Sequence, residues 1–166
     1  MADQDANYDE YLEIDLSELE PMIAKPSSPG NVVKVKEVAG KEIHQVVIGS
    51  SANPGIRDFW VASEIVKGKT VDSKVSFDIN PTSRQTIENL AITNAILNLV
   101  HAGARVHQAG CLGCIGMGQA PASNKISLRT MPRNFPGRSG TLDDKVYLCS
   151  PETCLLYTSP SPRDRG

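Results

Sequence analysis

The stretch HQVVIGSS, residues 44–51, decides the fold class. It is a short apolar run that enters a glycine turn, and this pattern predicts a buried strand of a parallel sheet. The next stretch, PGIRDFWVASEIVKGK (54–69), has spaced apolar residues, Pro54 near its start and Gly68 near its end. These features predict a helix. A strand followed at once by a helix is the repeating unit of an α/β sheet.

The same alternation continues toward the C-terminus. KVSFDINP (74–81) predicts a second strand, and residues 82–101 predict one long helix that Thr82 or Ser83 caps and Gly103 closes. The expected apolar stripe of this helix is Ile87, Leu90, Ala91, Asn94 and Leu97, with Ile96, Leu99 and Val100 beside it. Three further strands are expected in ARVHQAG (104–110), KISLRT (125–130) and KVYLCS (145–150). The sequence therefore predicts a three-layer α/β/α fold with a mainly parallel sheet.

The chain divides into three expected parts. Residues 1–31 are acidic and end in the Pro/Ser/Gly-rich AKPSSPGN, so we expect a surface arm and linker. Residues 32–153 form the α/β/α domain, with regular structure beginning at His44. Residues 154–166, CLLYTSPSPRDRG, are rich in Pro, Ser and Arg and are expected to be a non-native or disordered tail.

Composition limits the classes of partner and compartment. The 166 residues carry a net charge of −2 and include no basic patch, which argues against a nucleic-acid partner. No apolar run has the length of a transmembrane helix, so no membrane partner is expected. The acidic start MADQDANYDEYLEIDLSELE has no signal-peptide core. A cytoplasmic location is the default expectation, and there a CxxC pair indicates metal or redox chemistry.

The stretch AGCLGCIG, residues 109–116, contains such a pair, Cys111 and Cys114. Both sulfurs can face one centre, and the surrounding glycines let backbone amides approach it. Glycines at 116 and 118 argue against a thioredoxin-type redox helix. Structural zinc would need two more ligands, for which His107 is the nearby candidate. The spacing alone leaves an iron–sulfur cluster, zinc and structural thiols as open alternatives.

The loop RNFPGR, residues 133–138, presents two arginines around Pro-Gly. Guanidinium groups bind planar carboxylates in bidentate fashion, so Arg133 and Arg138 beside a metal centre suggest a polycarboxylate substrate. Their spacing alone favours two solvated surface arginines.

Four motifs in order resemble the aconitase family, in the region that holds its iron–sulfur cluster. VVIGSSANPGIRDF (46–59) is similar to the first cluster motif, and AGCLGCIGMG (109–118) to the second. PRNFPGR (132–138) is similar to the substrate-arginine loop, and VYLCSPET (146–153) to the strand that follows. The resemblance extends from about residue 8 to residue 153.

The resemblance implies a [4Fe–4S] cluster held by three cysteines, whose fourth iron acts as a Lewis acid on the substrate hydroxyl. It implies that Cys111 and Cys114 are ligands and that Arg133 and Arg138 bind substrate. Ser51 stands where the family has its third cysteine. The expected activity is that of an aconitate hydratase-type hydro-lyase, which interconverts citrate and isocitrate via cis-aconitate. The alternatives are an isopropylmalate isomerase large subunit and a non-catalytic metal-binding or structural module.

The resemblance also implies further parts of the enzyme. Family enzymes are longer, and their acid–base residues lie outside the matched region, so we expect the remaining domains of the parent chain as partners. The histidines at 44, 101 and 107 match no catalytic histidine of the family. We therefore expect this chain alone to lack hydro-lyase activity.

Overall fold

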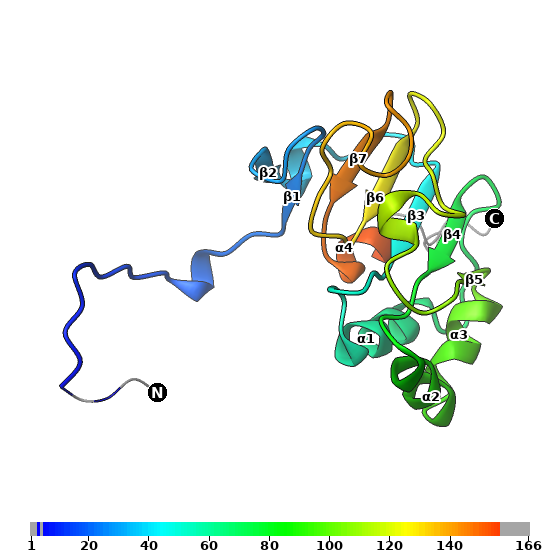
Figure 1. Ribbon diagram of the computed structural model, residues 1–166, viewed down its shortest axis with the longest axis horizontal. Helices are drawn as coiled ribbons and strands as arrows, with labels where there is room; N and C mark the ends of the chain where they lie inside the picture. Colours follow the sequence, from blue (N-terminus) through cyan, green and yellow to red (C-terminus); the bar gives the residue numbers. More distant parts are fainter. Residues whose placement is uncertain (1–2, 4, 157–166) are drawn as a thin grey trace.

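A computed structural model describes residue 3 and residues 5–156 of the chain. It contains a seven-stranded sheet with the strand order β2-β1-β7-β6-β3-β4-β5. The strands β7, β6, β3, β4 and β5 are parallel, and β1 and β2 are added antiparallel at one edge (Figure 1). The strands are β1 (Met22–Ala24), β2 (Val32–Lys34), β3 (Gln45–Ile48), β4 (Ser76–Ile79), β5 (Arg105–Val106), β6 (Ile126–Arg129) and β7 (Lys145–Leu148). The predicted α/β class with a mainly parallel sheet is confirmed.

The α-helices form one layer against this sheet. The described helices are α1 (Ile56–Val66), α2 (Arg84–Ile92), α3 (Ala95–His101) and α4 (Pro151–Leu156), with single 3-10 turns η1 (Leu16–Glu18), η2 (Val35–Glu37) and η3 (Gly113–Ile115). Helix α1 contacts both α3 and α4, so the layer is continuous (Figure 1). None of the helices in the part of the chain that the structure describes has the length and apolar character needed to cross a membrane.

The two faces of the sheet differ in chemistry because side chains alternate along each strand. Val46, Ile48 and Phe77 point to the helical layer and belong to the main apolar core. The opposite face bears polar residues that are nevertheless buried, among them Asp78 and Arg129. In the described structure this second face is covered by the loop from β5 to β6, which contains η3, and not by an α-helix. A buried polar face under a loop marks the position of the candidate site.

The predicted helix over 82–101 is interrupted. The Thr93 hydroxyl donates to the carbonyl of Asn89 at 2.9 Å, and Asn94 adopts a left-handed conformation with φ 58°. Bonding of a threonine hydroxyl to the preceding turn competes with the regular helix ladder and bends helices. The break rotates α3, so the expected stripe is only partly right. Leu90 and Leu99 are buried, whereas Asn94 and Leu97 are exposed. Ser83 caps α2 as predicted, since its side chain accepts from the Thr86 N–H.

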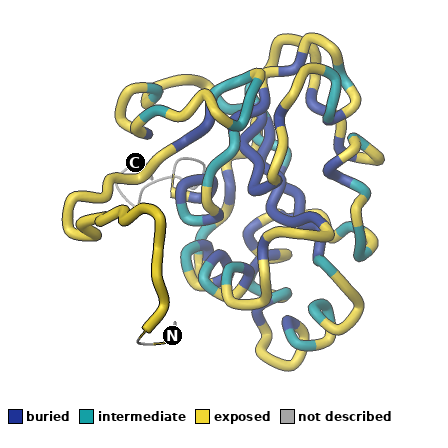
Figure 2. The backbone as a smooth tube through the Cα atoms, turned by 60° about the vertical axis from the view of Figure 1, so that its left-hand side comes forward, coloured by how far each residue is buried: buried dark blue, intermediate teal, exposed yellow. Residues whose placement is uncertain are grey.

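The ends of the described chain also depart from expectation. Regular structure begins at β1 and not at His44, and Ile23 of β1 is buried in the core. Residues 5–20 are exposed throughout and extend away from the body (Figures 1 and 2). At the other end, residues 154–156 belong to α4 and Leu155 is fully buried, so these three residues of the expected tail are ordered. The remainder of that expected tail, 157–166, lies outside the described residues.

Candidate functional site

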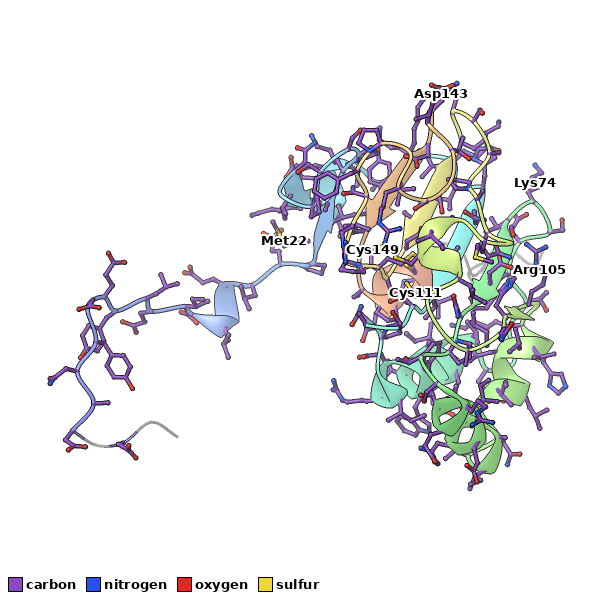
Figure 3. All side chains as sticks on the ribbon, in the orientation of Figure 1. Met22, Lys74, Arg105, Cys111, Asp143 and Cys149 are labelled. Atoms are coloured by element: carbon purple, nitrogen blue, oxygen red, sulfur yellow. The ribbon has the colours of Figure 1, made fainter. Side chains whose placement is uncertain are left out.

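Three loops meet at the carboxyl end of the parallel strands. They follow β3, β5 and β6, which lie side by side in register in the sheet with β4. Figure 3 shows Cys111 toward this end of the strands and Asp143 toward the opposite end. Ligand sites of open α/β sheets lie at this edge. The three loops contain all the site residues that the sequence predicts.

The structure brings Ser51, Cys111 and Cys114 together. The Cys111 side chain is hydrogen-bonded to Ser51, which lowers the pKa of the Cys111 thiol, and it also contacts the Cys114 thiol. Burial raises the pKa of the Cys114 thiol, and the charge of Arg138 opposes that increase. One thiol is therefore exposed and the other buried, with a hydroxyl beside them.

Arg138 is aimed at the buried thiol. Its guanidinium donates from Nη1 to the Cys114 carbonyl at 3.0 Å and from Nη2 to the Cys114 Sγ at 3.2 Å. Arg133 is exposed, and its charge, like that of Arg138, opposes the increase in the pKa of Cys114 that burial causes. Between the two arginines, the buried Asn134 donates from Nδ2 to the carbonyls of Lys25 and Val146. This anchor holds the arginine loop against the sheet edge.

The turn after β3 is fixed by the neighbouring strand. The Gly49 N–H donates to the Thr130 hydroxyl at 2.9 Å, and Asn53 Nδ2 donates to the Thr130 carbonyl at 2.6 Å. The Ser50 hydroxyl is buried inside the turn, where it donates to the Asn53 carbonyl. Ser50 thus shapes the turn, and Ser51 is left facing Cys111.

Sequence reasoning missed Asn80, which anchors the cysteine loop. This fully buried residue follows β4, accepts from the Gly113 N–H at 2.8 Å and donates to the carbonyls of Gln108 and Gly110. A polar residue at the carboxyl end of an apolar strand is the signal that could have identified it. Arg129, in the middle of KISLRT, was missed as well and is fully buried beneath the same loop.

The glycine spacing of the loop has a steric cause. Gly116 has φ +82°, and a Cβ at this position would collide with the Ser139 carbonyl. The loop therefore packs directly against the arginine loop, which a larger residue at 116 would prevent.

The donor set fits an iron–sulfur centre better than a zinc site. His107 is the nearby candidate for one of the two further zinc ligands. Its Nε2 lies 3.0 Å from Asp78 Oδ1 and 2.6 Å from the Gln119 amide nitrogen. Over residue 3 and 5–156, no group of three or more His, Cys, Asp or Glu side chains is placed to hold a metal ion. Two thiols and the Ser51 hydroxyl remain, with a cationic fork beside them. Thiolates are the common ligands of iron–sulfur clusters, and the positive charge favours their ionised form.

Comparison with known proteins gives the family. The model of the aconitase family (aconitate hydratase) matches residues 1–159. The 3-isopropylmalate dehydratase large subunit 1 of Methanopyrus kandleri is 42% identical over 169 residues, covering 96% of this chain and 40% of that protein. The homoaconitase large subunit of Thermus thermophilus is 39% identical over 151 residues, covering 90% of this chain and 36% of that protein. The chain thus spans no more than about two fifths of these relatives, with its cysteine and arginine loops inside the matched region. It belongs to the aconitase family.

Proposed function

We propose that the chain forms the cluster-binding part of the large subunit of a hydro-lyase of the 3-isopropylmalate dehydratase type. The observation that supports this most directly is the Arg138 fork on Cys114, next to Cys111 and Ser51 at one edge of the sheet. The homoaconitase type is the second candidate, because a homoaconitase large subunit is among the relatives.

The relatives favour the isopropylmalate alternative over the main expectation from sequence. Citrate and isocitrate have no support among the relatives compared above, which are 3-isopropylmalate dehydratase and homoaconitase large subunits. A role in the tricarboxylic acid cycle accordingly has no support either. The shared feature of the proposed substrates is a hydroxylated carbon between or beside carboxylates, which paired arginines are suited to bind.

Cys111, Cys114 and Ser51 would hold the [4Fe–4S] cluster. When bound, the cluster supplies a Lewis acid for the leaving hydroxyl. Arg133, which is exposed at the same edge, would bind a substrate carboxylate. Arg138 would hold the Cys114 thiolate and offer its remaining N–H groups to a second carboxylate. The base that removes the proton is proposed to lie in other parts of the enzyme, together with a small subunit as partner. The cytoplasm is the proposed compartment, because the thiols must stay reduced.

The test uses the complete large subunit that contains this chain, purified without oxygen together with its small subunit. We expect iron and sulfide in the protein and formation of an unsaturated product from 3-isopropylmalate, followed by ultraviolet absorbance. Cys114→Ala should abolish both. A kcat/KM that is higher for citrate than for 3-isopropylmalate would instead support an aconitate hydratase. Zinc in the protein in place of iron would support a non-catalytic metal-binding module.

Arg138→Lys in the same protein tests the arginine loop. The substitution keeps the charge but removes the fork, so kcat/KM should fall by about 30- to 900-fold, on the order of 2–4 kcal/mol. Arg57→Lys, at an exposed position of α1, is the matched control and should leave kcat/KM unchanged. An unchanged kcat/KM in Arg138→Lys would assign Arg138 a surface role only.

A further inference from the structure

Arg129 is a charged residue in the interior of the sheet. It is 0% exposed and is among the largest fully buried side chains of the described structure. Its position on β6 places it on the polar face, under the loop that contains the two cysteines. The alternation of apolar and polar residues in KISLRT explains why this segment forms a strand. It does not explain why the buried position 129 carries a guanidinium group.

The hydrogen bonds of Arg129 all go to neutral groups. Nε donates to the Ser127 hydroxyl at 2.9 Å, and Nη2 donates to Gln45 Oε1 at 2.8 Å and to the Gln119 carbonyl. Nη1 donates to the Gly113 carbonyl at 2.8 Å. Within residues 3 and 5–156, no carboxylate lies at ion-pair distance from this guanidinium. The hydrogen-bonding capacity of Arg129 is thus largely used, but its charge is not neutralised by a salt bridge.

An unneutralised charge in the interior is costly. The penalty for removing an ion from water is several kcal/mol even after the protein relaxes, and hydrogen bonds to neutral dipoles offset only part of it. Burial lowers the pKa of Arg129 to about 10, so the group still carries its charge at neutral pH. Asp144, Asp78 and Cys114 are the groups whose negative charge acts on it. Of these, Cys114 belongs to the candidate site.

The contacts of Arg129 enclose the cysteine loop. Its two terminal nitrogens donate to the carbonyl of Gly113, which directly precedes Cys114 and begins η3, and to the carbonyl of Gln119, which follows η3. On the same peptide segment, Asn80 accepts from the Gly113 N–H. Gly113 is therefore fixed through both its N–H and its carbonyl, and the Cys114 backbone follows from it.

We propose that Arg129 is a positioning residue of the metal centre, which fixes the loop over 113–119 and supplies buried positive charge to the Cys114 side of that centre. This proposal rests on the proposed function, since it assigns the negative charge to a thiolate-ligated iron–sulfur centre. Arg129 differs from Arg138, which donates to the Cys114 sulfur itself. Positive charge in a low-dielectric interior favours the more negative, reduced form of such a centre.

Two substitutions separate geometry from charge. Arg129→Lys keeps the charge but cannot reach both carbonyls with one planar fork, whereas Arg129→Gln removes the charge. Lys145→Gln is the matched control, because it removes one exposed positive charge from the neighbouring strand β7. All variants are made in the complete large subunit with its small subunit.

The first measurement is hydrogen exchange of the amides over 113–119 in metal-free protein. Both Arg129 variants should exchange faster than wild type, and Lys145→Gln should not. Wild-type exchange in both Arg129 variants would overturn the positioning role. This result does not depend on iron, so it can be separated from a failure of the proposed function.

The second measurement is the reduction potential of the reconstituted centre, followed by electron paramagnetic resonance during a redox titration. Arg129→Gln should have a more negative potential than wild type, whereas Arg129→Lys and Lys145→Gln should stay close to it. Equal potentials in Arg129→Gln and Lys145→Gln would overturn the charge role.

If Arg129→Gln fails to fold, Arg129→Lys carries the test. A wild-type reduction potential together with faster loop exchange in Arg129→Lys supports the proposal, and a shifted reduction potential in that variant contradicts it. A wild-type protein that binds no iron would overturn both the proposed function and the charge role.

Discussion

At the scale of single residues, Ser50 and Ser51 show how neighbouring identical side chains take different roles. The Ser50 hydroxyl is buried and closes the turn after β3 through the Asn53 backbone. Ser51 is exposed and hydrogen-bonds with the Cys111 thiol. Of the two serines, only Ser51 faces the cysteine loop.

Replacing Ser51 with cysteine should strengthen the metal site. A thiolate is a softer and more readily ionised ligand than a serine hydroxyl, so Ser51→Cys should slow iron loss to a chelator at least about tenfold. Ser51→Ala, which removes the hydroxyl, should speed the loss. The measurement is iron release from the anaerobically loaded large subunit. Identical rates in wild type and both variants would show that position 51 is no ligand.

The sequence predicted the meeting of Ser51, Cys111 and Arg138 for a physical reason. Each of these residues lies in a loop that follows a parallel strand, and such loops share one edge of the sheet. Asn80 and Arg129 were missed because strand periodicity does not reveal which face a loop will cover. A polar face normally indicates solvent, and here the cysteine loop buries it.

At the scale of elements, the five parallel strands were predictable, whereas the antiparallel strands β1 and β2 and the break in the second helix were not. Four of the five parallel strands contain short runs of residues that are buried on both faces, and this gives a strong signal. The break between α2 and α3 depends on the Thr93 hydroxyl and on the left-handed Asn94. Both residues are compatible with a helix interior on propensity alone, so no periodic pattern could exclude a continuous helix.

The interrupted helix predicts a difference between two leucines. Leu99 is 0% exposed in the core, whereas Leu97 is 49% exposed. Leu99→Ala should lower the free energy of unfolding by about 2–5 kcal/mol, the usual cost of emptying a core site. Leu97→Ala should change it by less than about 1 kcal/mol. Chemical denaturation of both variants measures this. A larger loss of unfolding free energy in Leu97→Ala than in Leu99→Ala would support the continuous helix and the apolar stripe that the sequence predicted.

At the scale of the whole molecule, we propose that other parts of the enzyme complete the site. The chain spans no more than about two fifths of the relatives compared above. The described residues supply two thiols, a hydroxyl and two arginines at the site. No histidine among residue 3 and 5–156 is hydrogen-bonded to either thiol. His107 lies against Asp78 and Gln119, and His101 is the last residue of α3.

This division predicts that the chain alone binds iron without turning over substrate. Dehydration needs a Lewis acid at the hydroxyl, a base at the adjacent carbon and groups that hold both carboxylates. In the proposed function, the loops around Cys111 and Arg138 would hold the Lewis acid and one part of the substrate. We assign the base to no residue among 3 and 5–156. The test is to reconstitute the 166-residue chain with iron and sulfide and to follow the ultraviolet absorbance of unsaturated product from 3-isopropylmalate and from citrate. We expect an iron–sulfur absorption spectrum that is lost in Cys111→Ser, and no product above a matched blank. Turnover that disappears in Cys111→Ser would show that the catalytic base lies within this chain.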